Sequence, residues 1–313
     1  MSDNAAIKNE SENKKSVLCV GMCVLDIVHV CNEFPVEDQD KRSKHGRWQR
    51  GGNASNNCTV LSQMDMACEF FGPLTKLKMF QFVLDDMTDR KIDYSHCAYH
   101  NCEAPISSIL LNEATGSRTI IHSNPNMPYV TYDDFRCLNL TDYGWIHFEG
   151  RHHEETMKMM QSVVAFNEGR LDRITVSLEL EKLQPENLSL AKFADVVIIS
   201  KDLAIHLGYE NKTMAVHSFR KRTRTGNIII CPWGTDGVAA LDSNDKLFTA
   251  EAYPPDIVVD SLGAGDTFAA AVIFSLYWKH TLDFAIKFAS RLAGLKVGFF
   301  GYDQIRENFK KFL

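Results

Sequence analysis

The sequence predicts an α/β protein with a mainly parallel β-sheet, helices on both faces of that sheet, and a small discontinuous β-sheet lid. Two observations support this prediction. Short runs rich in β-branched residues alternate with longer runs of helical spacing, which is typical of parallel strands joined by helices. Two segments, 27–50 and 99–123, break the alternation because they contain strand-like runs with no helix between them.

The expected strands of the main sheet recur along most of the chain. They are SVLCVG (16–21), CEFFG (68–72), WIHFEG (145–150), ITVSLEL (174–180), DVVIIS (195–200) and NIIIC (227–231). Helices are expected over 53–64, 77–90 and 154–166, and the apolar run 269–274 predicts a further, buried helix. Wholly apolar strands such as DVVIIS indicate a sheet that is covered on both sides. In such folds ligands bind beyond the carboxyl ends of the strands.

The two interrupted segments predict a small separate sheet. In the second segment, ISSILLN and SRTIIHS flank EATG, which predicts a β-hairpin with its turn at Ala114 to Gly116. Both segments leave the core and return to it, an arrangement that suits a lid closing over a site. The core is expected over 16–26, 51–98 and 124–313, the lid over 27–50 and 99–123, and a disordered tail over 1–15.

Composition argues against several functional classes. The 313 residues include 34 basic and 40 acidic side chains, a formal net charge of −6, so no nucleic-acid partner is expected. No apolar run reaches the roughly 18 residues of a membrane span, and the polar N-terminus is unlike a signal peptide; a cytoplasmic protein is expected. The nine cysteines include no C-x-x-C pair, which predicts reduced, mostly buried thiols.

The segment GGNASNN (51–57) opens the first expected helix. Gly51 and Gly52 permit close approach of the backbone, while Asn53 and Asn56 share one face of the starting helix. Their amides offer donors and acceptors, which suits a polyhydroxy ligand, and Asp26 at the end of the first expected strand adds a charged acceptor. The structural alternative makes Asn53 an N-cap and Asn56 a surface residue.

A second glycine-opened helix begins at GAGDTF (263–268). Gly263 and Gly265 leave bare backbone N–H groups at the helix start, where the helix dipole favours an anion such as phosphate. Asp266 would repel that anion unless it had another purpose, although it could also be an N-cap or first-turn acid. If one helix start holds hydroxyls and the other holds phosphate, Asp266 is suited to accept a proton from an attacking hydroxyl. The expected chemistry is therefore phosphoryl transfer to an alcohol, with Asp266 ionised near the helix start as a weak base.

No Walker A motif, protein-kinase motif set or G-x-G-x-x-G dinucleotide motif is present in the sequence. The early GGNASNN, the late DSLGAGDTF and VLDI after the first strand instead resemble the ribokinase family of ATP-dependent sugar kinases, from about Val17 to about Gly301. RWQRGGNASN, FVLDDM, NEATGSRTI, IHFEGR and SKDLAIHLG are most similar to the branch of that family that phosphorylates fructose at its 1-hydroxyl.

The resemblance implies a ribokinase-like fold and a set of functional residues. It implies that Asp26, Gly52, Asn53 and Asn56 hold the sugar, that Asp266 is the catalytic base, that Gly263, Ala264 and Gly265 form an anion hole, and that Arg118, Gly234, Thr235, Asp236 and Gly237 contact ATP. A solvated turn arginine is the structural alternative for Arg118.

The resemblance also implies Mg–ATP, often with a bound potassium ion, and a homodimer formed through interlocking lids. Many family members carry Asn-x-x-Glu near the magnesium, whereas SKDL stands here at 200–203, so no metal ligand is assigned.

Two alternatives to a fructose kinase stay open at the level of sequence. One is a kinase for another acceptor, such as a different ketose, ribose or adenosine, because details of the pocket set this choice. The other is a catalytically silent sugar or nucleotide sensor on the same scaffold, against which the intact GAGD argues.

Overall fold

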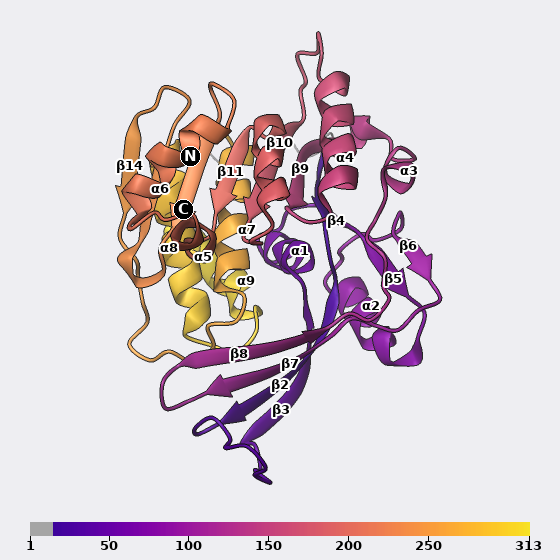
Figure 1. Ribbon diagram of the computed structural model, residues 1–313, viewed down its shortest axis with the longest axis vertical. Helices are drawn as coiled ribbons and strands as arrows, with labels where there is room; N and C mark the ends of the chain where they lie inside the picture. Colours follow the sequence, from indigo (N-terminus) through magenta and orange to yellow (C-terminus); the bar gives the residue numbers. More distant parts are fainter. Residues whose placement is uncertain (1–14) are drawn as a thin grey trace, which may run out of the picture.

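The computed structural model describes residues 15–313, in which a large α/β core carries a smaller sheet along one side (Figure 1). The predicted disordered tail lies outside the described residues except for Lys15, whose carbonyl accepts a hydrogen bond of 2.5 Å from the Tyr277 hydroxyl. Over residues 15–313, no helix is long and apolar enough to cross a membrane.

The central sheet has eight strands in the order β14-β13-β12-β11-β10-β9-β1-β4. They are β1 (Ser16–Val20), β4 (Cys68–Phe71), β9 (Tyr143–Glu149), β10 (Thr175–Leu180), β11 (Val196–Ile199), β12 (Ile228–Pro232), β13 (Val238–Leu241) and β14 (Leu247–Ala250). The pairs from β12 to β4 are parallel, and β13 and β14 add an antiparallel edge. Every strand predicted for this sheet is present, which confirms the mainly parallel α/β prediction.

Helices cover both faces of the central sheet (Figure 1). One face carries α1 (Asn53–Gln63), α2 (Gln81–Asp89), α7 (Ala264–Tyr277), α8 (Leu282–Val297) and α9 (Gln304–Asn308); the other carries α3 (Tyr132–Phe135), α4 (His153–Phe166), α5 (Lys201–His206) and α6 (Lys212–Phe219). Short 3-10 helices are η1 (Lys78–Phe80), η2 (Leu140–Asp142), η3 (Pro185–Phe193), η4 (Arg220–Arg222), η5 (Gly234–Asp236) and η6 (Phe309–Phe312). Alternate residues of β1 face the two sides, since Val17 and Cys19 join one core cluster and Leu18 and Val20 the other.

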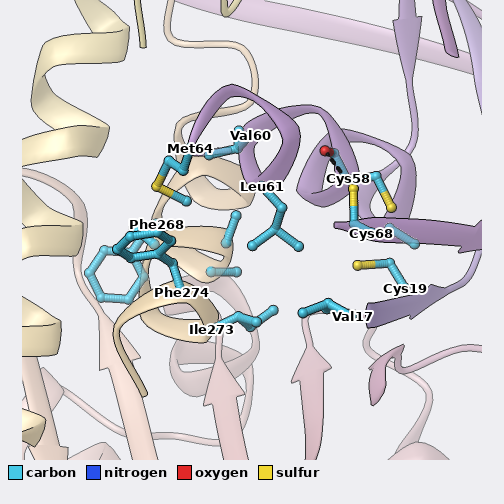
Figure 2. Packing of buried hydrophobic residues seen from close by; sticks show 14 of the residues in the cluster. Val17, Cys19, Cys58, Val60, Leu61, Met64, Cys68, Phe268, Ile273 and Phe274 are labelled. Carbon is cyan, nitrogen blue, oxygen red and sulfur yellow. Dashed lines mark hydrogen bonds between the residues drawn. The ribbon is translucent and has the colours of Figure 1, made fainter. Parts of the chain in front are cut away.

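The packing of α1 against α7 determines where the site can form. Figure 2 shows Leu61 of α1 and Met64, which follows this helix, near Phe268 and Ile273 of α7, with Val17 of β1 at the base of the same cluster. All five side chains are buried, and burial of each apolar side chain of this size contributes about 1.5–3 kcal/mol. The first turns of two helices that are distant in sequence are thereby held beside each other.

A four-stranded sheet, here called the small sheet, extends from the core in the order β3-β2-β7-β8. Its strands are β2 (Val24–Cys31), β3 (His45–Gly51), β7 (Ile106–Asn112) and β8 (Ser117–Ser123). The predicted hairpin is present as β7 and β8, whose antiparallel register places Asn112 opposite Ser117. The small sheet begins at Val24 rather than at residue 27, and β6 (Ala98–His100) pairs with β5 (Pro73–Thr75) instead of joining it.

One face of the small sheet packs against the segment before α7. Leu262 shares a buried cluster with four side chains of this face, Val28, Val30, Ile109 and Leu111. The Ser261 hydroxyl lies 3.4 Å from the carbonyl oxygen of Gly116 at the hairpin tip. The side chain of Arg47 on β3 contacts Asp260 at 3.1 Å. The small sheet is therefore closed against the core.

The cysteines are confirmed as free thiols. All nine lie within the described residues, and only Cys102 and Cys137 are not buried. Burial raises the pKa of Cys23 to about 12, which keeps this thiol protonated and unreactive at neutral pH.

Candidate active site

The candidate site lies at the carboxyl edge of the parallel strands, between β1 and β9. The strand order reverses there, because β4 and β9 lie on opposite sides of β1. Such a switch point leaves a crevice at the strand ends. The backbone N–H of Met22, just after β1, donates a hydrogen bond of 3.0 Å to Oε2 of Glu149 at the end of β9. A buried carboxylate thus lies at the switch point.

The start of α1 enters this crevice through a turn that requires glycine. Gly52 has a φ of 94°, and a Cβ at this position would lie 2.2 Å from the carbonyl oxygen of Met22. Asn53 is the first residue of the helix, and its Nδ2 lies 3.4 Å from Oε2 of Glu179 on β10. The alternative of Asn53 as an N-cap does not hold, because Gly52 occupies that position.

The start of α7 also depends on a glycine. Gly263 caps the helix with a φ of 75°, and an added Cβ would lie 1.9 Å from the hydroxyl oxygen of Tyr302. The backbone N–H groups of the first helical turn lack partners within the helix. Gly265 is exposed in that turn, so its backbone is accessible to a ligand.

The two helix starts meet directly. Nδ2 of Asn56 donates a hydrogen bond of 2.7 Å to Oδ2 of Asp266, across 210 residues of sequence. Nδ2 of Asn57 donates to the backbone carbonyl of Asp266 at 3.0 Å. The Oδ1 atoms of both asparagines are buried and have no hydrogen-bond partner. These two amide oxygens therefore have no hydrogen-bond donor, although they belong to side chains that contact Asp266.

Asp26 lies on a different element from the one predicted. It was expected at the end of the first strand, but the chain breaks after β1 and Asp26 is the third residue of β2 in the small sheet. Its carboxylate packs against the backbone of Gly51, where an added Cβ would lie 2.0 Å from Oδ2 of Asp26. Burial raises the pKa of Asp26 to about 7, although a hydrogen bond with Ser107 partly offsets the rise.

Two buried glutamates beside Asp266 were not predicted as functional residues. Burial and then the charges of Asp266 and Glu149 raise the pKa of Glu179. Burial alone would raise the pKa of Glu149, but the charges of Arg151 and Lys182 bring it below its ordinary value. Glu149 is the last residue of β9, in WIHFE, and Glu179 is the next-to-last residue of β10, in TVSLEL. An acid in a buried strand end is the sequence signal that could have identified them.

Asp266 was expected to stay ionised at neutral pH because it lies near the helix start. Burial raises its pKa to about 6, and the charge of Glu149 adds to the rise, so the carboxylate is still mainly ionised at pH 7. The hydrogen bond from Asn56 and the charges of Lys182 and Arg118 oppose the rise. Asp266 is consequently a stronger proton acceptor than an exposed aspartate.

Arg118 lies on β8, opposite Leu111 of β7. Its charge lowers the pKa of Asp266, so its guanidinium is within electrostatic reach of the carboxylate. The hairpin that carries it ends at Gly116, where an added Cβ would lie 3.1 Å from Val258 Cγ1. The closed small sheet therefore holds a cation over the start of α7.

The predicted nucleotide segment, Gly234 to Gly237, follows β12 as the 3-10 helix η5. Gly237 has a φ of 82°, and an added Cβ would lie 2.1 Å from the carbonyl oxygen of Ala250. The side chain of Lys212 donates to the carbonyl of Asp236. This segment stands at the same edge of the sheet as Glu149, but three strands along from β9.

No metal centre is evident in the part of the chain that the structure describes, where no group of three or more His, Cys, Asp or Glu side chains could hold an ion. His152 stacks on Tyr129 with ring centroids 5.1 Å apart, and Nε2 of His153 lies 2.7 Å from the Ser189 hydroxyl. The adjacent histidines thus have structural partners.

Comparison with known proteins assigns the geometry to a family of enzymes. The model of the pfkB family of carbohydrate kinases matches residues 14–304. Ketohexokinase from Mus musculus is 40% identical over 295 residues, covering 93% of this chain and 99% of that protein. Ribokinase from Arabidopsis thaliana, solved with ribose and ATP, superposes with a TM-score of 0.77 at 19% identity over 95% of this chain and 98% of that one. Adenosine kinase from Sinorhizobium meliloti has a TM-score of 0.77 at 16% identity over 95% and 99%. These two structures bear on the fold alone.

Proposed function

Because the chain belongs to the pfkB family of carbohydrate kinases, we propose that it transfers a phosphoryl group from ATP to the 1-hydroxyl of D-fructose, giving fructose 1-phosphate and ADP. A single observation supports this proposal most strongly. The contact of 2.7 Å between Asn56 and Asp266 places a group suited to binding hydroxyls beside a group suited to accepting a proton, at the start of a helix suited to binding phosphate. The mouse relative, a ketohexokinase, favours a ketose as the acceptor.

Asp266 is the proposed base. The reacting hydroxyl of the sugar donates to its carboxylate and passes its proton there as the bond to phosphorus forms. The raised pKa makes Asp266 a better acceptor while leaving it ionised above its titration range. Asn56 fixes one carboxylate oxygen, which leaves the other for the hydroxyl.

The remaining hydroxyls of the sugar are assigned to Asp26, Gly52, Asn53 and Asn56. The unused Oδ1 of Asn56 supports this assignment because a sugar hydroxyl can donate to it. The turn at Gly52 brings its backbone close to the carbonyl oxygen of Met22, at the end of β1 where the sugar is proposed to bind. Asp26 supplies a charged acceptor from the small sheet, so closure of that sheet completes the sugar site.

The phosphoryl group is assigned to the start of α7. Backbone N–H groups of Gly263, Ala264 and Gly265 point from the positive end of a 14-residue helix and stabilise the charge of the transferring group. Arg118 adds a cation from the lid, suited to bidentate contact with ATP phosphates.

The segment from Gly234 to Gly237 is the proposed border of the nucleotide, along the same edge of the sheet. Mg²⁺ bound to ATP neutralises phosphate charge and is held mainly by phosphates and water, which fits the lack of a dedicated cage among residues 15–313. A potassium ion stays a prediction, as does the cytoplasmic location.

A homodimer through the small sheet is also proposed. The face opposite the Leu262 cluster carries Trp48 and Ile121, which are 50% and 64% exposed, although the Trp48 ring also contacts the edge of Phe82 with centroids 5.8 Å apart. Large exposed apolar side chains on an open sheet favour a protein partner. Sedimentation velocity of the wild-type chain and of Trp48→Glu tests this proposal, and a wild-type monomer at micromolar concentration contradicts it.

A panel of acceptors tests the proposed reaction. The purified protein is assayed for ADP release with fructose, another ketose, ribose and adenosine, and the product is placed by phosphorus-coupled NMR. Highest kcat/KM with fructose and phosphate on the 1-hydroxyl is expected. Faster turnover of ribose or adenosine assigns the site to another acceptor, while binding of sugar without turnover of any acceptor identifies a silent sensor.

A further inference from the structure

A row of four polar residues crosses the inner face of the small sheet. Gln49 pairs with Asp26, Asp26 with Ser107, and Ser107 with His122, across β3, β2, β7 and β8. Directly opposed residues of neighbouring strands point to the same face. Asp26 and Ser107 are each only 5% exposed, whereas His122 is exposed. The row therefore runs from the buried sugar-site carboxylate to an accessible imidazole.

The hydrogen bonds along this row have a defined direction. Ser107 lies directly opposite Asp26 in the strand register, and its hydroxyl lowers the pKa of Asp26 by favouring the charged carboxylate. Its oxygen lies 3.2 Å from Nδ1 of His122. A hydroxyl has one proton to donate, so when it donates to the carboxylate it must accept from the imidazole. In that arrangement Nδ1 of His122 is the donor, and polarisation along the chain strengthens the bond to Asp26.

The electrostatic surroundings keep His122 neutral in this role. Its pKa is lowered first by burial and then by the charges of Arg151 and Lys182, while the charge of Glu149 opposes them. A neutral imidazole with its proton on Nδ1 leaves Nε2 as an acceptor. The mechanism assigns no task to His122 or Ser107, although both sit in the row that contains Asp26.

We propose that His122 is a positioning residue of the sugar site, which acts through Ser107 to hold Asp26 ionised and correctly oriented toward the acceptor. The inference rests on the proposed function, because it requires Asp26 to bind the sugar. It predicts that His122 affects binding of the sugar and does not affect binding of ATP. His122 and Ser107 lie on the small sheet, which the structure shows packed against the segment before α7.

Four variants test the inference: Ser107→Ala, His122→Leu, His122→Asn and the matched control Ser108→Ala. Ser108 is the next residue of β7, is exposed and faces the other side of the sheet. Loss of a hydrogen bond to a charged group predicts a rise of about 10-fold in the sugar KM for Ser107→Ala, and loss of the imidazole a rise of about 3-fold for His122→Leu. Asparagine retains a donor near Nδ1 and should restore the sugar KM, and Ser108→Ala should leave it unchanged.

The pH profile distinguishes positioning from a general loss of structure. Protonation of Asp26 makes kcat/KM for the sugar fall as pH decreases through about 7. Ser107→Ala and His122→Leu should move this fall in kcat/KM to higher pH, because each weakens the hydrogen bonding that stabilises the ionised form of Asp26 and so raises its pKa. The ATP KM should stay within about twofold of the wild-type value, because no nucleotide contact changes.

The possible failures are distinguishable. If the wild-type protein phosphorylates no sugar, the proposed function fails before the variants are compared. If it does phosphorylate sugar, an unchanged sugar KM and an unchanged pH profile in His122→Leu overturn the inference alone. Equal increases in the KM for sugar and the KM for ATP also overturn the inference. So does a sugar KM that stays high in His122→Asn. Calorimetric titration of sugar with a non-hydrolysable ATP analogue gives a second readout that does not depend on turnover.

Discussion

Substitution of Asp260 by asparagine tests the ion cluster that joins the small sheet to the core. The Asp260 side chain is completely buried, and its Oδ2 lies 3.1 Å from Nζ of Lys296, whose side chain is also completely buried. Arg47 of β3 contacts the same oxygen at 3.1 Å. The other oxygen, Oδ1, accepts from the backbone N–H of Leu262 at 3.0 Å. Every carboxylate oxygen is thus used by donors from different elements.

An asparagine cannot replace this carboxylate. Its single oxygen can accept either from Leu262 or from the lysine and arginine, and its NH2 group then faces other donors. Lys296 would be left as a buried cation whose nearest remaining partners are the carbonyl of residue 260 at 2.9 Å and the Tyr302 ring at 5.5 Å. Breaking a buried pair from one side costs about 3–5 kcal/mol. Deprotonation of Lys296 limits the loss, so we expect about 3 kcal/mol.

The size of this effect and its pH dependence can both be measured. A loss of about 3 kcal/mol corresponds to a decrease in Tm of roughly 4–5 °C in a chain of this size, because the entropy of unfolding is about 2.1 cal/mol/K per residue. Burial already lowers the pKa of Lys296, and loss of Asp260 lowers it further. At pH values between the folded and unfolded pKa of Lys296, the unfolded state binds more protons than the folded state, so the stability of the variant rises with pH. The stability lost in Asp260→Asn should therefore become smaller as pH rises toward the unfolded lysine pKa of about 10.4.

Thermal and urea unfolding of Asp260→Asn and of a matched control provide the assay. Asp283→Asn removes the same charge from an exposed pair with Lys287 at 2.7 Å, and should cost no more than about 0.5 kcal/mol. Adding Lys296→Met to Asp260→Asn should recover part of the loss, because the unpaired cation is then absent. A deficit below about 1 kcal/mol at pH 7, or one that does not change with pH, refutes the reasoning.

Four further predictions concern the site itself. Asp266→Asn should fold and bind sugar but lose about 10³-fold in kcat, measured by ADP release; full activity removes Asp266 from the mechanism. Arg118→Ala should raise the ATP KM about tenfold with sugar affinity unchanged by calorimetry, and a defect confined to sugar contradicts its placement. Wild-type sugar KM should rise as pH falls through about 7, where Asp26 gains its proton, and a flat profile from pH 5.5 to 8.5 disagrees with this assignment. Gly263→Ala should lower both Tm and kcat because its Cβ would lie 1.9 Å from the Tyr302 hydroxyl. The control Gly226→Ala is also at positive φ but has open space around it, so it should cost only about 1 kcal/mol of stability and no activity. Equal effects of the two substitutions would mean that the contact with Tyr302 is unimportant.

Local features of the chain were predictable because they depend on near neighbours in sequence. Glycines were expected to open α1 and α7, and in the structure Gly52 and Gly263 stand at these helix starts with positive φ. The strands of the main sheet follow from their apolar runs. The antiparallel edge β13–β14 and the pairing of β6 with β5 were not predicted, because short strands are chosen by their partners rather than by their own pattern.

The site was only partly predictable from sequence. Asp26 was identified as a candidate, but it was placed on the wrong element because VLDI continues the apolar pattern of β1 across a break in the chain. Glu149 and Glu179 were missed as functional residues because their position beside Asp266 depends on the strand order around β1. The charge state of Asp266 was expected from the helix start alone, whereas in the folded chain burial raises its pKa most and the hydrogen bond from Asn56 opposes that rise.

The sequence by itself determined which chemical groups stand at each helix start, since glycine turns, amides and carboxylates are properties of a few adjacent residues. Only the tertiary structure decided that Asn56 and Asp266 meet, because that contact follows from the packing of α1 against α7 and from the strand order beneath them. It also decided that Asp26 and Arg118 approach from the small sheet, since the face that each strand presents depends on its pairing.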